Sequence, residues 1–237
     1  MRRVPAVRRS LELVAARELS PTVRELSFRT ADGAPLDYLA GQFWKLYLPD
    51  GVERDYSAAS APDPARPDHF SIAVTRVDGP GSDYLHRIEL GEQVGSLGPN
   101  GFFVRDEPHR DLPALYVGTG TGLSPLRAML EEELARPDGP PQTLLFGCRT
   151  EASILWRDEL DRWSRGGRLR VEISLSRGAE DWQGRRGWVQ AHLRELLPPA
   201  PAHVYVCGLS PMVGEVRRVL KEELGVDRRH VHSERYD

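Results

Sequence analysis

Apolar and polar positions alternate with a period of two in the first hundred residues, most clearly over 25–29 and 70–75. Such alternation is typical of strands that bury one face. Turn signals separate these runs at residues 31–33, 49–51 and 62–64. Several short strands at this spacing predict an antiparallel β-barrel, interrupted by one helix from Ser82 to about Leu90.

The rhythm changes after the polar stretch 106–111, where short apolar runs begin to alternate with helical patterns. The predicted strands cover residues 114–118, 143–147, 169–175, 203–207 and 229–235. The predicted helices cover residues 124–135, 153–163, 188–197 and 211–224. This alternation predicts a doubly wound α/β parallel sheet. We therefore expect two domains, a β-barrel over 1–107 and an α/β domain over 108–237.

Composition narrows the classes of partner. The net charge of −3 lacks the basic excess that nucleic-acid binding needs. No apolar run reaches the roughly 18 to 20 residues of a membrane helix, and the basic residues 2–9 precede no secretory-type apolar stretch. Two cysteines, Cys148 and Cys207, are too few for a four-cysteine metal cluster and fit a reducing compartment. The seven histidines are scattered, so we expect no metal site, and we expect a cytoplasmic monomer.

The segment Gly-Thr-Gly-Thr-Gly-Leu-Ser-Pro at 118–125 directly follows a predicted strand. Its glycines let the backbone approach an anion closely, and the following helix start favours negative charge. Ser124 is predicted as the helix N-cap and Pro125 as the first helical residue. The spacing differs from the dinucleotide motif G-x-G-x-x-G. The alternative is a tight strand-to-helix turn without a ligand.

Four other segments fall at the ends of predicted elements. Arg54-Asp55-Tyr56-Ser57 offers a phosphate partner, an aromatic ring and a hydroxyl; the equally weighted alternative is Tyr56 as a core residue and Arg54 as a solvated charge. The glycine turn at 79–82 enters a helix and predicts a second anion site. The turn after Cys207 lies beside 118–122 if both follow neighbouring parallel strands. The fourth segment is the tail, residues 234–237.

Together these segments resemble the ferredoxin–NADP reductase superfamily of flavin- and nicotinamide-dependent proteins over nearly the whole chain. The matching motifs are R-x-Y-S at 54–57, G-x-x-S-x-x-L at 79–85, G-P-x-G-x-F from 98, G-T-G-T-G-x-x-P at 118–125 and C-G-x-x-x-M at 207–212. The resemblance implies FAD rather than FMN as cofactor, because two phosphate turns lie in the first domain.

The resemblance also implies roles for single residues in the flavin site. Arg54 would contact the flavin pyrophosphate, Tyr56 would lie against the isoalloxazine ring, and Ser57 would hydrogen-bond near its N5 atom. Gly81 and Ser82 would hold the pyrophosphate at the start of a helix.

In the second domain the resemblance implies a site for NADPH or NADH. Thr119, Gly120 and Thr121 would approach its pyrophosphate. Cys207 would flank the nicotinamide, in a turn that includes Gly208 and Met212, unless it is a small buried filler. Glu234 and Tyr236 would border the flavin–nicotinamide contact, although Asp237 follows Tyr236 here. The implied catalytic residues are Ser57, Cys207 and Glu234.

Coenzyme preference depends on the segments after the next two strands. Arg149 follows one strand, and the pair Ser176-Arg177 follows the next and resembles a binding site for the 2′-phosphate of NADPH. In contrast, residues 181–187 resemble the oxygenase-reductase branch, in which NADH is common. We favour NADPH slightly.

The implied function is transfer of a hydride from NAD(P)H to FAD, with electrons passing on to a ferredoxin or an oxygenase component. A stand-alone reductase is expected, because the cysteines for an iron–sulfur domain are missing and the cluster would lie on another chain. Two alternatives stay open: a flavin reductase that releases reduced flavin, and a non-catalytic regulatory or electron-shuttling subunit.

Overall fold

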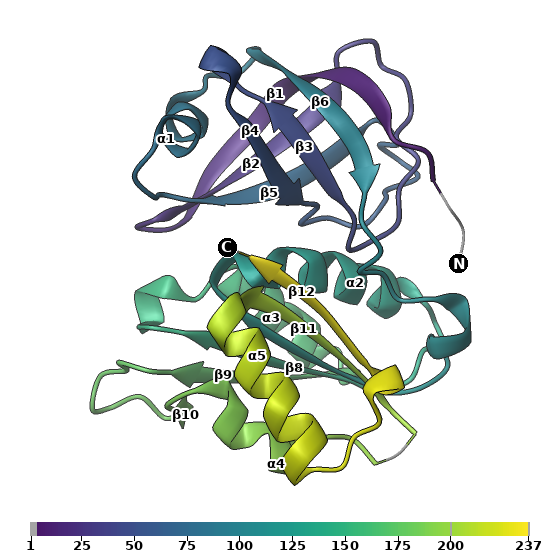
Figure 1. Ribbon diagram of the computed structural model, residues 1–237, viewed down its shortest axis with the longest axis vertical. Coiled ribbons are helices and arrows are strands. Elements are labelled where there is room, and N and C mark those ends of the chain that lie inside the picture. The colour runs from purple at the N-terminus through teal and green to yellow at the C-terminus, as the bar shows by residue number, and fades with distance from the viewer. Residues whose placement is uncertain (1–3, 200, 237) are drawn as a thin grey trace.

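The computed structural model describes residues 4–199 and 201–236 and contains two six-stranded sheets, one antiparallel and one parallel (Figure 1). This confirms the predicted fold class. In the part of the chain so described, no helix is both long enough and apolar enough to cross a membrane.

The antiparallel sheet has the strand order β4-β3-β6-β1-β2-β5. Its strands are β1 (Val7–Ser20), β2 (Val23–Thr30), β3 (Phe43–Tyr47), β4 (Glu53–Ser57), β5 (His69–Thr75) and β6 (Gln93–Asn100). Strands β3, β4 and β6 cross in front of β1, β2 and β5, so the sheet encloses a core that includes Phe28, Trp44 and Ile72 (Figure 1). The predicted helix is α1 (Pro80–Arg87), which begins at Pro80 because Gly79, with a φ of 141°, ends the preceding loop.

The parallel sheet has the order β10-β9-β8-β7-β11-β12. Its strands are β7 (Ala114–Thr119), β8 (Gln142–Cys148), β9 (Leu169–Leu175), β10 (Arg185–Arg186), β11 (His203–Leu209) and β12 (Val231–Tyr236). The chain runs outward from β7 to β10 and then returns to the other side of β7. The order therefore reverses between β7 and β11, and in such sheets ligands bind outside the carboxyl ends of the strands at that point.

Helices cover both faces of this sheet. On one face, α2 (Leu123–Ala135) and α3 (Arg157–Arg165) pack on Tyr116, Phe146 and Tyr205. On the other, α4 (Leu193–Leu196) and α5 (Ser210–Arg218) pack on Leu115, Leu145 and Val206. Short turns are η1 (Pro49–Gly51), η2 (Glu107–His109), η3 (Gly120–Gly122), η4 (Glu151–Ser153), η5 (Val189–His192), η7 (Arg228–His230) and the π-helical η6 (Val219–Glu223).

Three predicted helices differ from those observed, and the one predicted over 153–163 begins only at Arg157, because Trp156 before it has left-handed backbone geometry. The segment predicted as a helix over 188–197 is the 3₁₀ turn η5 followed by the single turn α4. Pro198 and Pro199 follow α4, and the residue before a proline disfavours helical geometry. The predicted helix over 211–224 begins as α5 and ends as the π-helix η6.

The prediction that Ser124 is an N-cap is wrong. The 3₁₀ turn η3 runs directly into α2, so Gly122 occupies the cap position and Pro125 lies third in the helix. Ser124 is buried, and its hydroxyl has no hydrogen-bond partner among the residues that the structure describes. Proline is tolerated there because the first helical turn needs no N–H donor.

The two sheet units share a continuous core along α2. Ala59 and Phe103 of the barrel belong to the same buried cluster as Met129 of α2. The side chain of the buried Arg127 donates to the carbonyl of Ala59, and the Glu131 carboxylate accepts from the Ala61 N–H at 2.8 Å. Helix α2 thus packs against the barrel and joins it to the parallel sheet.

Candidate active site

A cleft of about 1200 Å³ lies between the two units, above the carboxyl ends of β7 and β11. It exceeds the roughly 300–1,000 Å³ of a typical pocket for one small ligand. Of the sixteen residues predicted from the sequence, thirteen line it: Arg54, Tyr56, Ser57, Ser82, Thr119, Gly120, Thr121, Arg149, Ser176, Gly208, Met212, Glu234 and Tyr236. The other three are Gly81, Cys207 and Arg177.

Ser57 joins the end of the barrel strand β4 to the C-terminal strand β12. Its hydroxyl donates to Glu234 Oε1 at 3.0 Å and accepts from the Tyr236 hydroxyl at 2.8 Å. Ser57 is itself buried. Glu234 and Tyr236 point to the same side of β12 because strand side chains alternate. The network therefore places one hydroxyl at the meeting point of both units.

Burial shapes the ionisation of this network. It raises the pKa of Glu234 to about 7, an effect that the Ser57 hydrogen bond opposes and Asp55 reinforces. Burial, reinforced by Glu234, also raises the pKa of the Cys207 thiol well above its ordinary value. The Tyr236 hydroxyl contacts this thiol. Near neutral pH the site thus holds a protonated thiol beside a carboxyl group that can gain or lose a proton.

The barrel side of the cleft offers a cation and a ring. Arg54 is exposed, donates to the carbonyl of Glu53 at 2.7 Å, and forms no ion pair with any described residue. Tyr56 is half-buried, and burial raises its pKa to about 12, so its phenol stays neutral. An unpaired guanidinium beside a neutral ring suits a phosphate attached to an aromatic group.

The start of α1 presents backbone donors rather than a hydroxyl. Ser82 Oγ is already engaged, because it accepts from the Val77 N–H at 3.0 Å and donates to the Thr75 carbonyl at 3.2 Å. Gly81 is buried, and a Cβ there would lie 3.2 Å from side-chain atoms of Leu48 and Val52. The free N–H groups of this first turn are therefore what an anion would meet.

On the other side, the loops after β7 and β11 pack backbone against backbone. A Cβ at Gly122 would lie 2.4 Å from the Cys207 carbonyl oxygen. Gly208 has a φ of 151°, and a Cβ there would lie 2.5 Å from Thr119 Oγ1. Only glycine fits at both positions, which explains two of the motif glycines. The Thr75 hydroxyl donates to the Thr121 hydroxyl at 3.3 Å and ties this loop to the barrel.

The predicted coenzyme residues separate into two groups. Arg149 and Ser176 line the cleft, and the Arg149 side chain forms no ion pair within the described part of the chain. Arg177 is exposed and does not line the cleft, although its N–H donates to the Arg149 carbonyl at 2.8 Å. Cys207 is fully buried beneath the cleft floor.

Sequence reasoning missed two apolar side chains on the rim. Trp188 is 69% exposed and Leu209 is 63% exposed, and both line the cleft. A tryptophan directly after Arg186-Gly187 was the available signal. The interpretation of the histidines as scattered is wrong for four of them, which gather at the opposite end of the parallel sheet.

These residues fit two dinucleotides. Two glycine-containing helix starts, the unpaired cations Arg54 and Arg149, and the rings of Tyr56 and Trp188 all face one cleft or border it. An antiparallel barrel joined to a doubly wound sheet, with these features at their junction, defines a flavin- and nicotinamide-dependent oxidoreductase.

Comparison with known proteins supports this class of oxidoreductase. The model of the oxidoreductase FAD-binding domain matches residues 10–104, and that of the oxidoreductase NAD-binding domain matches residues 116–218. Ferredoxin–NADP reductase B of Sorangium cellulosum (strain So ce56) is 51% identical over 95% of this chain and 96% of its own length. The chain therefore belongs to the ferredoxin–NADP reductase superfamily and is an FAD-dependent NAD(P)H oxidoreductase.

Other relatives are longer. The electron transfer component of anthranilate 1,2-dioxygenase from Acinetobacter baylyi is 31% identical over 85% of this chain, which spans 59% of that relative. Among solved structures, the ferredoxin reductase in carbazole 1,9a-dioxygenase has a TM-score of 0.86 and 26% identity, covering 99% of this chain and 70% of that one.

Proposed function

We propose that this chain passes electrons from NAD(P)H, through FAD, to a separate acceptor protein, a ferredoxin or an oxygenase component. The observation that carries the proposal is the Ser57 network, which joins β4 and β12 inside the cleft. The names of the relatives, a ferredoxin–NADP reductase and an oxygenase electron transfer component, support this class of acceptor.

The barrel side would hold FAD. We assign the flavin pyrophosphate to Arg54 and to the backbone of Gly81 and Ser82, because an unpaired cation and a helix start both favour phosphate. Tyr56 would cover one face of the flavin ring. The hydroxyl of Ser82 is excluded as a phosphate donor by its bond to Thr75, so its contribution would come from the backbone.

The parallel-sheet side would hold the nicotinamide dinucleotide. Its pyrophosphate would lie on η3, against Thr119, Gly120 and Thr121. Arg149 and Ser176 face the cleft and would bind the 2′-phosphate of NADPH, with Arg177 at the outer edge. The exposed ring of Trp188 is a stacking surface for the adenine, and Gly208 with Met212 would border the nicotinamide.

Bound FAD supplies the redox chemistry, because it exchanges two electrons with a nicotinamide and single electrons with a one-electron acceptor. Side chains of the protein would orient the flavin ring and hold or release a proton during this exchange. Ser57 would hydrogen-bond to the flavin ring, and Glu234, with a pKa of about 7, would hold or release a proton through Ser57. A nicotinamide that reaches Cys207 would have to displace Tyr236, whose hydroxyl contacts the thiol.

Two further assignments are also proposals. We place the domain boundary after residue 107, in the segment between β6 and β7. We propose a cytoplasmic monomer, because both cysteines are free and three of the six large exposed apolar side chains among the described residues, Val77, Trp188 and Leu209, line the cleft rather than an outer face.

One experiment distinguishes this function from the second candidate, a flavin reductase. Purified protein is desalted, its flavin content is measured, and NAD(P)H oxidation is followed with oxidised ferredoxins or with free flavin as acceptor. Retained FAD and ferredoxin reduction support the proposal. Colourless protein that turns over only with added flavin supports the flavin reductase, and no turnover with either acceptor supports a non-catalytic subunit.

A further inference from the structure

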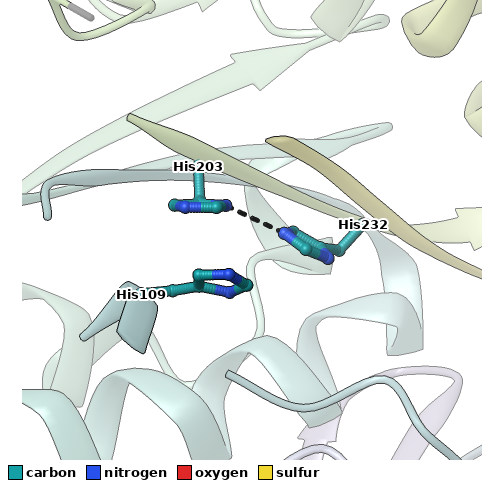
Figure 2. Close-up of side chains that lie close together, drawn as sticks. All are labelled: His109, His203 and His232. Atoms are coloured by element: carbon teal, nitrogen blue, oxygen red, sulfur yellow. Dashed lines mark hydrogen bonds between the residues drawn. The ribbon is translucent and has the colours of Figure 1, made fainter. Parts of the chain in front are cut away.

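A cluster of histidines lies at the amino-terminal ends of β11 and β12, opposite the cleft. His203 opens β11, His232 lies in β12, and His109 ends the 3₁₀ turn η2 in the segment that links the two sheets (Figure 2). Tyr205 pairs directly with His232 across the two strands. His203 therefore lies on the same face of the sheet, two residues before this pair, and His109 approaches it from the linker.

The three imidazole rings are in close contact. His203 Nδ1 and His232 Nε2 are 2.9 Å apart, and the His109 ring stacks on that of His203 with 3.9 Å between centroids (Figure 2). One ring nitrogen from each of the three lies within 4.8 Å of the others. We propose that His109, His203 and His232 form a binding site for a divalent transition-metal ion such as Zn²⁺, with solvent as a further ligand.

The spacing is near that of a tetrahedral site. Zinc binds imidazole nitrogen at about 2.0–2.1 Å, which places its ligand atoms about 3.3–3.4 Å apart. The 2.9 Å contact between His203 and His232 would widen slightly on binding, and the His109 nitrogen would move inward by a rotation of its side chain. The strands fix the backbones of two of the ligands, so the larger adjustment falls on the linker residue His109.

The hydrogen bonding of the cluster is incomplete without a ligand. His109 Nδ1 is buried and has no hydrogen-bond partner among the described residues. The cluster therefore leaves one buried ring nitrogen open to a ligand.

The surrounding charges tolerate a cation. Arg105 is a positive group that acts on both His203 and His232, and its carboxylate partner Glu133, 3.8 Å away, is shared with Arg110 and Arg136. Arg105 also donates to the Tyr116 hydroxyl at 2.8 Å. Asp106, the residue after Arg105, favours positive charge at His232. A bound ion would therefore meet one partly compensated guanidinium and the carboxylate of Asp106.

The position makes this a structural site. His203 lies four residues before Cys207, about 13 Å along a parallel strand, so the ion would not touch the reacting groups. It would clamp the interdomain linker to the two strands that carry Cys207 and Glu234. The proposal does not depend on the identity of the electron acceptor.

The test uses tag-free holoprotein treated with a chelator at neutral pH and titrated with Zn²⁺ by calorimetry. We expect one Zn²⁺ per chain, and we expect His109→Gln to weaken binding at least about tenfold. His230→Gln is the matched control, since its ring lies 5.0 Å from His203 but outside the ligand set, and it should bind as the wild type does. FAD content and turnover of each variant report its folding.

No saturable binding by the wild type, or equal weakening by both substitutions, would overturn the proposal. X-ray absorption spectroscopy of the zinc-loaded wild type identifies the zinc ligands without the use of any variant. Three imidazole nitrogens at about 2.0–2.1 Å support the site, and a shell of oxygen ligands alone contradicts it.

Discussion

Tyr236 donates a hydrogen bond of 2.8 Å to Ser57, although 179 positions separate them in the sequence. The bond connects the last described residue of the parallel sheet to the barrel. The same Tyr236 hydroxyl also contacts the thiol of Cys207. Access of a nicotinamide to Cys207 is therefore coupled to breaking this bond.

Removing the Tyr236 hydroxyl should ease that access. In Tyr236→Phe the ring keeps its packing but loses a hydrogen bond worth about 0.5–1.5 kcal/mol, so NAD(P)H should bind about two- to tenfold more tightly. Equilibrium titration of both proteins with a non-reacting nicotinamide analogue measures the change. Unchanged or weaker binding would show that the bond does not oppose the nicotinamide.

Arg54 should contribute to flavin retention. Because it has no ion-pair partner within the described chain, Arg54→Ala should weaken FAD binding by about 1.5–3 kcal/mol, the scale of a charged hydrogen bond. Arg87→Ala, which changes an exposed arginine of α1 outside the cleft, is the control. Full flavin in Arg54→Ala after extensive dialysis would assign the phosphate to other groups.

Stability should depend on pH through Glu234. The folded protein keeps this proton to about pH 7, whereas the unfolded chain releases it near 4.5. The folded state binds more protons between these values, so the free energy of unfolding falls as the pH rises through this window. Glu234→Gln should remove this loss, which is on the order of 2–3 kcal/mol, and the exposed control Glu180→Gln should retain it. Urea unfolding from pH 4.5 to 8 measures the slopes, and equal slopes in all three proteins would disprove the assignment.

Arg149 and Arg177 should distinguish NADPH from NADH. A phosphate contact by arginine is worth about 1.5–3 kcal/mol, so losing it should raise the NADPH KM roughly ten- to a hundredfold and leave that for NADH nearly unchanged. We expect Arg149→Ala to have the larger effect, because Arg149 lines the cleft and Arg177 does not. Steady-state kinetics with both coenzymes provide the comparison. Two variants that behave as the wild type does with NADPH would exclude a phosphate role for this edge.

The period-two alternation of the first hundred residues and the alternation of apolar runs with helical patterns after them predicted both sheets, because these patterns are local. The glycines of 118–122 were also predictable, since glycine is needed where the backbones of Gly122 and Cys207 approach within contact distance. Ser124 was misjudged because the 3₁₀ turn η3 extends the helix backward by a geometry that no single residue type marks.

The relationships that define the site could not be derived from local sequence. The bonds of Ser57 to residues 234 and 236 depend on how the barrel docks on α2. The histidine cluster is likewise non-local, because His109 of η2 meets His203 and His232, which lie more than ninety residues further along the chain. The pair His230 and His232, where the turn η7 meets β12, was a local sign of it.

The central claim is that this chain carries electrons from NAD(P)H through bound FAD to a separate protein. Anaerobic stopped-flow absorbance tests it directly: the holoprotein is mixed with NADPH or NADH, and the reduced protein is then mixed with oxidised ferredoxin. We expect loss of the flavin absorbance in the first step and its return in the second, with FAD still bound to the protein. Release of reduced flavin into solution, or no return of absorbance with any ferredoxin tested while free flavin is reduced rapidly, would contradict it.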